Sequence, residues 1–193
     1  QVITDREVRI GELAAWAAHR SRRVATRTAT KNQLLAQLDR AFPGLTLALP
    51  DVLGTKIGRL VAAEFADPAR LAALGVNRLI RFASTRDVQL RRPVAERLVA
   101  AAKDALPTRD AVVARRVVAA DVSLLVDLDH QIVDAEGERA ASLPSSPFAT
   151  LTSVPGWGVI RVPNYAAALG DPRRWPGPRQ IHRASGPPPP QYE

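Results

Sequence analysis

A long helical stretch near the start of the chain sets the class of the fold: residues 4–42 read TDREVRIGELAAWAAHRSRRVATRTATKNQLLAQLDRAF. Good helix formers dominate this stretch, and no proline interrupts it before Pro43. We therefore expect one helix over residues 4–42, stopped by Phe42-Pro43-Gly44. Apolar side chains form a face near each end of it, namely Ile10, Leu13, Trp16 and Ala17, and then Leu34, Leu35, Leu38 and Phe42.

A second long helix is predicted over residues 109–141, directly after Pro107-Thr108. Its antiparallel partner is either the first helix of the same chain or the copy of that helix in a second molecule, and the sequence leaves both open. We expect a homo-oligomer. Apolar residues recur along this helix every three or four positions and form a narrow coiled-coil seam: Val113, Val117, Ala120, Leu124, Leu128, Ile132 and Ala135.

Shorter helices are expected between the two long ones. Asp51 is the predicted cap of a helix that runs to Phe65, and Asp67-Pro68 has the form of another helix start. Gly75 is expected to divide two short helices at an angle, and a further helix is predicted over residues 93–106. The predicted fold is all-α, with long antiparallel coiled-coil helices and a small helical insert, followed by a helix-hairpin-helix.

A domain boundary is predicted near residue 145. Residues 143–147 read LPSSP, which is the composition of a linker. We expect a helical coiled-coil region over residues 1–145 and a second domain over residues 146–193.

A glycine-containing bend follows that boundary. Residues 151–158 read LTSVPGWG, and residues 165–171 read YAAALGD. An apolar helical turn, a Pro-Gly bend and a second helix make the sequence form of a helix-hairpin-helix, which turns several backbone N–H groups outward and binds anions. A plain packing corner between helices is the alternative. The expected nucleic-acid contacts here are Pro155, Gly156, Gly158, Arg161, Arg173 and Arg174.

Four cations recur along the middle of the first helix at spacings of three, four and four: Arg20, Arg23, Arg27 and Lys31. They are predicted to lie along one side of the helix over about 17 Å. Like charges at this spacing repel, and no acidic residue lies between Arg20 and Lys31 in the sequence. We expect this stripe to contact phosphates of a nucleic acid; a solvated helix face is the alternative.

Composition favours a polyanionic partner. The 193 residues carry 27 Lys and Arg against 19 Asp and Glu, a formal net charge of +8. There is no cysteine, and His19, His130 and His182 lie too far apart for the local ligand spacings of zinc motifs. No apolar run is long enough to span a bilayer, and no secretion signal is present, so we expect a cytoplasmic protein without membrane contact.

An acidic group in the second long helix is expected to be surface and not a metal site, because no histidine joins it at a suitable spacing. The acidic residues are Asp127, Asp129, Asp134, Glu136 and Glu138. We expect no metal or other cofactor to be held by this segment.

The chain begins at Gln1 and contains no methionine, so we expect a fragment of a longer protein.

Several of these motifs together resemble the insertion-sequence transposases of the IS-one-ten group. The resemblance rests on LTSVPGWG at 151–158, ALGDPRRW at 168–175, and HRASG at 182–186 leading to QYE at 191–193. KNQL at 31–34 and FPGL at 42–45 are similar to the central helical region of that family. Pro187 departs from the family, which generally has a leucine there.

The resemblance implies a function in DNA transposition. Family members join a RuvC-like domain with four metal-binding acidic residues to a coiled-coil segment and a C-terminal domain with a catalytic serine, and some are guided by a structured RNA. The implied partners are DNA and, in the guided case, that RNA. By this comparison the divalent metal and the nucleophile belong to regions outside the present sequence, and no catalytic role falls on Ser185 or His182.

Two other interpretations compete with that of a catalytically incomplete transposase fragment. One is a non-enzymatic helical DNA-binding or adaptor protein that uses a helix-hairpin-helix. The other is a structural coiled-coil protein whose charge only keeps it in solution.

Overall fold

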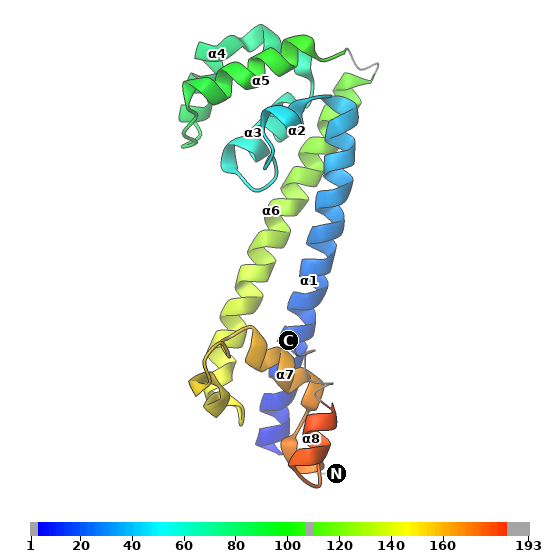
Figure 1. Ribbon diagram of the computed structural model, residues 1–193, viewed down its shortest axis with the longest axis vertical. Helices are drawn as coiled ribbons and strands as arrows, with labels where there is room; N and C mark the ends of the chain where they lie inside the picture. The colour runs from blue at the N-terminus through cyan, green and yellow to red at the C-terminus, as the bar shows by residue number, and fades with distance from the viewer. Residues whose placement is uncertain (1–3, 107–109, 185–193) are drawn as a thin grey trace, which may run out of the picture. The chain divides into compact units, whose positions relative to one another are not determined.

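The computed structural model describes residues 4–106 and 110–184. Every regular element in these two ranges is a helix, which confirms the all-α class (Figure 1). The elements are α1 (Asp5–Ala41), α2 (Leu45–Ala48), α3 (Lys56–Phe65), α4 (Pro68–Ser84), α5 (Arg92–Asp104), α6 (Ala111–Ser142), the 3₁₀ turns η1 (Leu143–Ser145) and η2 (Ala149–Ser153), α7 (Arg161–Leu169), the 3₁₀ turn η3 (Pro172–Arg174) and α8 (Pro178–Ala184).

Proline and glycine mark the helix ends much as the sequence predicts. Helix α1 ends before Pro43, and Gly44 then takes a φ of +87°, a conformation that suits glycine. Asp67 caps α4 by accepting a hydrogen bond from the amide of Ala69 at 3.1 Å. Gly75 interrupts α4 with a φ of +72°, which confirms the predicted division there.

The predicted cap at Asp51 is wrong. Helix α3 begins at Lys56, and Thr55 is its capping residue. The Thr55 hydroxyl accepts a hydrogen bond from the amide of Gly58 at 3.1 Å. Both residue types cap helices well, so the sequence pattern alone does not separate the two positions.

The described chain packs as two units. The first unit comprises residues 1–25 and 128–193, and the second comprises residues 26–127. In the second unit, α4 and α5 lie side by side (Figure 1) and share one core with the second half of α1 and the first half of α6. Phe65 of α3 meets Phe82 of α4 edge to face, with ring centroids 5.1 Å apart.

The first unit draws its core from both ends of the chain. One cluster of its buried apolar residues comprises Ile10, Leu13, Leu143, Phe148, Val162, Ala166 and Leu169. Residues beyond 145 therefore pack against the first turns of α1, so the packing units do not divide at the sequence boundary predicted near residue 145.

The predicted linker at residues 143–147 is a packed bend. Leu143 and Ser146 are buried. The Ser146 hydroxyl donates to the carbonyl of Leu143 at 2.7 Å and accepts from the amide of Phe148 at 3.3 Å. Serine side chains that satisfy nearby backbone groups fix a turn, and here they fix it against the core.

The first half of the predicted seam of α6 is not covered by the described part of the chain. Val113, Val117 and Leu124 are 61%, 45% and 43% exposed, and Ala120 is exposed as well. Apolar residues occupy two sides of this part of the helix, and periodicity gives their spacing but not which side is covered. Further along, Leu128 and Ala135 are buried as predicted, and the covered residues of the first half are Val118, Val122 and Leu125.

The structure shows which helix packs against the buried side of α6, a point that the sequence left open. In the second unit, Leu34 and Leu38 of α1 lie in the same core as Val118 and Val122 of α6. The first helix of the same chain thus supplies partners for the buried side. Within the described ranges, no helix has both the length and the apolar character that crossing a membrane requires.

Candidate nucleic-acid interface

A tight Pro-Gly turn joins η2 to the segment before α7. The amide of Trp157 donates to the carbonyl of Val154 at 3.0 Å, which closes the turn around Pro155 and Gly156. Gly156 has a φ of +80°. Proline followed by a residue with positive φ is the combination that a type II turn requires, so a side chain at position 156 would strain the backbone.

The turn is held in place by aromatic packing. Trp157 is half-buried and meets Tyr165 of α7 edge to face, with ring centroids 5.1 Å apart. Tyr165 also meets buried Phe148 edge to face at 6.3 Å. The bend is therefore anchored to the core of the first unit on one side, while Pro155, Gly156 and Gly158 remain exposed on the other.

The start of α7 presents open backbone donors. The first helical hydrogen bond runs from the amide of Val162 to the carbonyl of Gly158 at 3.1 Å, and α7 has no side-chain cap. As far as the described residues go, the amides of Gly156 and of residues 158–161 donate to no backbone or side-chain acceptor. All five residues are exposed. Such donors, together with the positive end of the helix dipole, are the features that anion-binding sites at helix starts use.

Arg161 adds a charge next to these amides. It is exposed, and its Nη1 lies only 3.3 Å from the position that a Cβ on Gly156 would take. The side chain therefore folds back over the glycine. The structure brings four of the sequence-predicted contacts together at this place: Pro155, Gly156, Gly158 and Arg161.

Arg139 of α6 lies against the start of α7, and sequence reasoning missed it. It is fully buried, and its Nη2 donates to the carbonyl of Ile160 and, at 3.0 Å, to Oδ1 of Asn164. Burial lowers the pKa of Arg139, the nearby cation of Arg20 lowers it further, and Glu136 raises it. A signal was available in the sequence, because Arg139 continues the apolar series Leu128, Ile132, Ala135 at the next seam position.

The cation stripe of α1 differs from the expectation of exposed, unneutralised charges. Nε of Arg20 lies 2.6 Å from Oε1 of Glu136, so an acidic residue distant in sequence does neutralise one member. All four cations are half-buried. Arg20 and Arg23 belong to the first unit, whereas Arg27 and Lys31 belong to the second. Glu136 is accordingly an internal partner of Arg20 and not an unpaired surface carboxylate.

Arg173 and Arg174 lie beyond the other end of α7. Asp171 fixes the 3₁₀ turn that carries them, since its carboxylate accepts from the amide of Arg173 at 3.0 Å and from Nε of Arg6 at 3.2 Å. The indole of half-buried Trp175 donates to the carbonyl of Leu169 at 3.1 Å and covers the end of α7. Both arginines are exposed, and they belong to a turn of their own.

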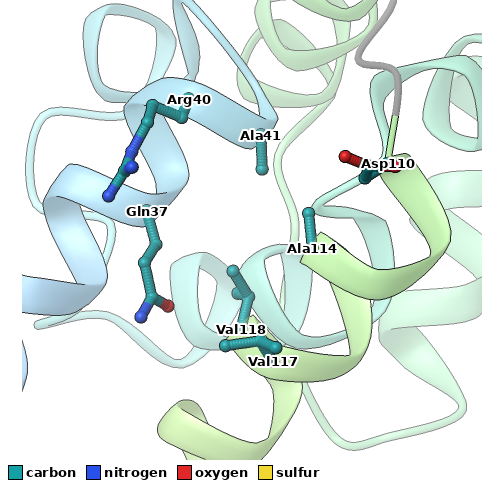
Figure 2. A pocket seen from close by; sticks show the side chains of 7 residues that line it. All are labelled: Gln37, Arg40, Ala41, Asp110, Ala114, Val117 and Val118. Carbon is teal, nitrogen blue, oxygen red and sulfur yellow. The ribbon is translucent and has the colours of Figure 1, made fainter.

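A shallow groove in the second unit carries little chemistry. Figure 2 shows Ala114, Val117 and Val118 of α6 facing Gln37 and Ala41 of α1, with the side chain of Arg40 directed away from the valines. The groove encloses about 340 Å³, and Asp110 lines it as well. It is an apolar hollow beside the exposed valines of α6.

No metal centre is formed by the part of the chain that the structure describes, because no group of three or more His, Cys, Asp or Glu side chains comes together there. Ser185 and Gly186 of the predicted motif at residues 182–186 lie outside the described residues, as do Pro187 and residues 191–193. No family model, curated protein sequence or solved structure matches this chain.

Proposed function

We propose that the chain binds the sugar-phosphate backbone of a nucleic acid through the turn that precedes α7. The observation that carries this proposal is the set of open amides at Gly156 and residues 158–161, with the Arg161 side chain folded back over Gly156. A phosphate oxygen accepts several amide hydrogen bonds at such a site, and the guanidinium supplies a charged donor. The net charge of +8 favours the approach of a polyanion.

The motifs that resemble IS-one-ten transposases make DNA the preferred partner and transposition the proposed context. In this proposal the turn and α7 act as the helix-hairpin-helix, with Arg173 and Arg174 as further phosphate contacts. A structured guide RNA would offer the same phosphate chemistry. Phosphate contacts position a nucleic acid but carry no base information, so binding by these residues is sequence-tolerant. Binding and positioning are the steps assigned to this chain, and no bond cleavage is assigned to its residues.

The test is the affinity of the chain for duplex DNA of arbitrary sequence, measured by fluorescence anisotropy at several salt concentrations. Binding is expected to weaken steeply between about 50 and about 200 mM salt. Arg161→Ala is expected to weaken binding and to reduce the salt slope by about one. Arg78→Ala is the matched control, because Arg78 is an exposed arginine of α4 in the second unit. Affinity that does not change with salt, or equal effects of the two variants, would refute the proposal.

We also propose that copies of the chain associate through the exposed side of α6. Val113, Val117, Ala120 and Leu124 are spaced by four, three and four residues, so the stripe reads the same in both directions and two copies can pair antiparallel about a twofold axis. The exposure of this apolar stripe favours the pairing. Sedimentation equilibrium tests it: the wild-type chain should dimerise and Val117→Asp should be monomeric. Arg116→Ala, an exposed change on the same helix, is the control.

A further inference from the structure

Arg139 is an unusual residue for the interior of a small helical unit. Arginine is almost never fully buried unless a carboxylate pairs with it. Arg139 has no exposed surface, and it forms no ion pair with any carboxylate of the described chain. Glu136, one turn earlier on α6, has its carboxylate engaged by Arg20. The charge of Arg139 is therefore left without a direct counter-ion.

The hydrogen bonds that Arg139 makes all lead to the start of α7. Its Nη2 donates to Ile160 and Asn164, the two residues on either side of the first turn of the helix. Its Nε and Nη1 are buried and have no acceptor. The side chain thus fixes the backbone at Ile160, which carries one of the open amides, and it keeps a positive charge beside the start of α7.

Stability does not account for this arrangement. Replacing a buried charged residue by an apolar one of similar volume is often neutral or stabilising, because the charge no longer has to be desolvated. The helix dipole and the exposed Arg161 already make the start of α7 positive, so the buried charge of Arg139 is unfavourable there in the free protein. The same charge becomes favourable once an anion lies on the amides.

We propose that Arg139 is a positioning residue of the phosphate site, which holds the amides of residues 158–161 in place and strengthens their hold on a bound phosphate through its buried charge. The inference deepens the proposed function and rests on it. The ligand chemistry is a phosphate oxygen, carried either by a nucleic-acid backbone or by a free phosphate ion.

The experiment compares the wild-type chain with Arg139→Met, Arg139→Lys and Arg161→Ala in three measurements. Thermal melts report stability, anisotropy reports affinity for a duplex of arbitrary sequence, and NMR follows the amide signals of residues 158–161 during titration with inorganic phosphate. Arg139→Met is expected to melt at or above the wild-type temperature, yet to bind DNA about fivefold more weakly. Its amide signals should respond less to phosphate. Arg139→Lys retains the charge but cannot donate to both acceptors in the same way. Its DNA affinity and its amide response should lie between those of the wild type and Arg139→Met.

Each other outcome has a defined meaning. If Arg139→Met unfolds or melts lower while Arg139→Lys restores both stability and full binding, Arg139 is a structural residue and the inference fails. If Arg161→Ala weakens binding but Arg139→Met binds like the wild type, the inference fails and the proposed function stands. If the wild-type chain binds no DNA and its amides do not respond to phosphate, both fail. The wild-type amides could respond to phosphate although the chain binds no DNA. If that response is lost in Arg139→Met, the result supports the phosphate site and refutes the nucleic acid as its partner.

Discussion

Helices α4 and α7 begin in opposite ways. Asp67 closes the start of α4, because its carboxylate accepts from the amide of Ala69 at 3.1 Å. Helix α7 has no side-chain cap, and it places a buried arginine and an exposed one, Arg139 and Arg161, near its positive end. Acidic and hydroxyl side chains are the caps that stabilise a helix start best. In the proposed function, the negative charge at the start of α7 comes from a bound phosphate.

The largest effect is expected when the start of α7 is given an anion of its own. Gly158 supplies the carbonyl that accepts the first helical bond and has open space where a Cβ would be, so an aspartate there reaches the amides two and three residues on. Gly158→Asp is expected to weaken DNA binding at least about tenfold, because its carboxylate occupies the amides and repels phosphate. Thermal stability should rise slightly. Fluorescence anisotropy and thermal melts measure both.

Two control variants at position 158 separate the effect of the added charge from the effects of occupying the amides and of adding a side chain. Gly158→Ala adds a Cβ without an acceptor and is expected to bind DNA like the wild type. Gly158→Asn occupies the amides without adding charge, and should weaken binding less than Gly158→Asp. Equal binding by Gly158→Asp and the wild type would show that these amides do not hold the phosphate.

An intermediate effect is expected when α4 loses its cap. Asp67→Ala should lower the free energy of unfolding by about 1 kcal/mol, because the amide of Ala69 loses its acceptor. DNA affinity should not change. Chemical denaturation measures the loss, and Asp67→Asn is the matched control, since asparagine caps helices as well as aspartate does. A fall in DNA affinity with Asp67→Ala would contradict the distinction between the two helix starts.

The smallest effect is expected at Asp171, which caps the start of the 3₁₀ turn η3. The hydrogen bond from the amide of Arg173 lowers the pKa of this carboxyl below its ordinary value of 3.8, and Arg6 lowers it further. A lowered pKa stabilises the fold above the pKa of the unfolded chain, and that stability is lost as the pH falls through the lower value of the folded state. The difference in unfolding free energy between wild type and Asp171→Asn should therefore be constant above about pH 5 and shrink below about pH 4.

Denaturation curves at a series of pH values check this prediction. The whole difference is expected to stay below about 1 kcal/mol. A difference that grows as the pH falls would mean that the carboxylate of Asp171 is not stabilised by these contacts.

The helices could be predicted from the sequence because their ends are fixed by local chemistry. Pro43 and Gly44 stop α1, Asp67 starts α4, and Gly75 divides it, and each acts through the backbone of its immediate neighbours. The side of α6 that is covered could not be predicted, since both sides carry apolar residues at helical spacing. Which side is buried depends on contacts with α1, which is distant in sequence.

The candidate site was predictable only in part, for the same reason. The Pro-Gly turn and Arg161 are close in sequence, and the turn has a recognisable pattern. Arg139 and Glu136 act on residues far away in the chain, Arg139 on Ile160 and Glu136 on Arg20. A single arginine in a long helix has no pattern that distinguishes a buried residue from a surface one, apart from its place in the seam.

The division of the chain into one continuous and one discontinuous unit has a consequence for synthesis on the ribosome. Residues 26–127 form a unit from one unbroken segment, so its core is complete as soon as that segment has emerged. Ile10 and Leu13 emerge earlier, but their partners Val162 and Leu169 are made much later. Ile10 and Leu13 of α1 thus lack these partners until α7 has been made. Because the chain between them forms a long loop that must close, we expect the first unit to fold after the second.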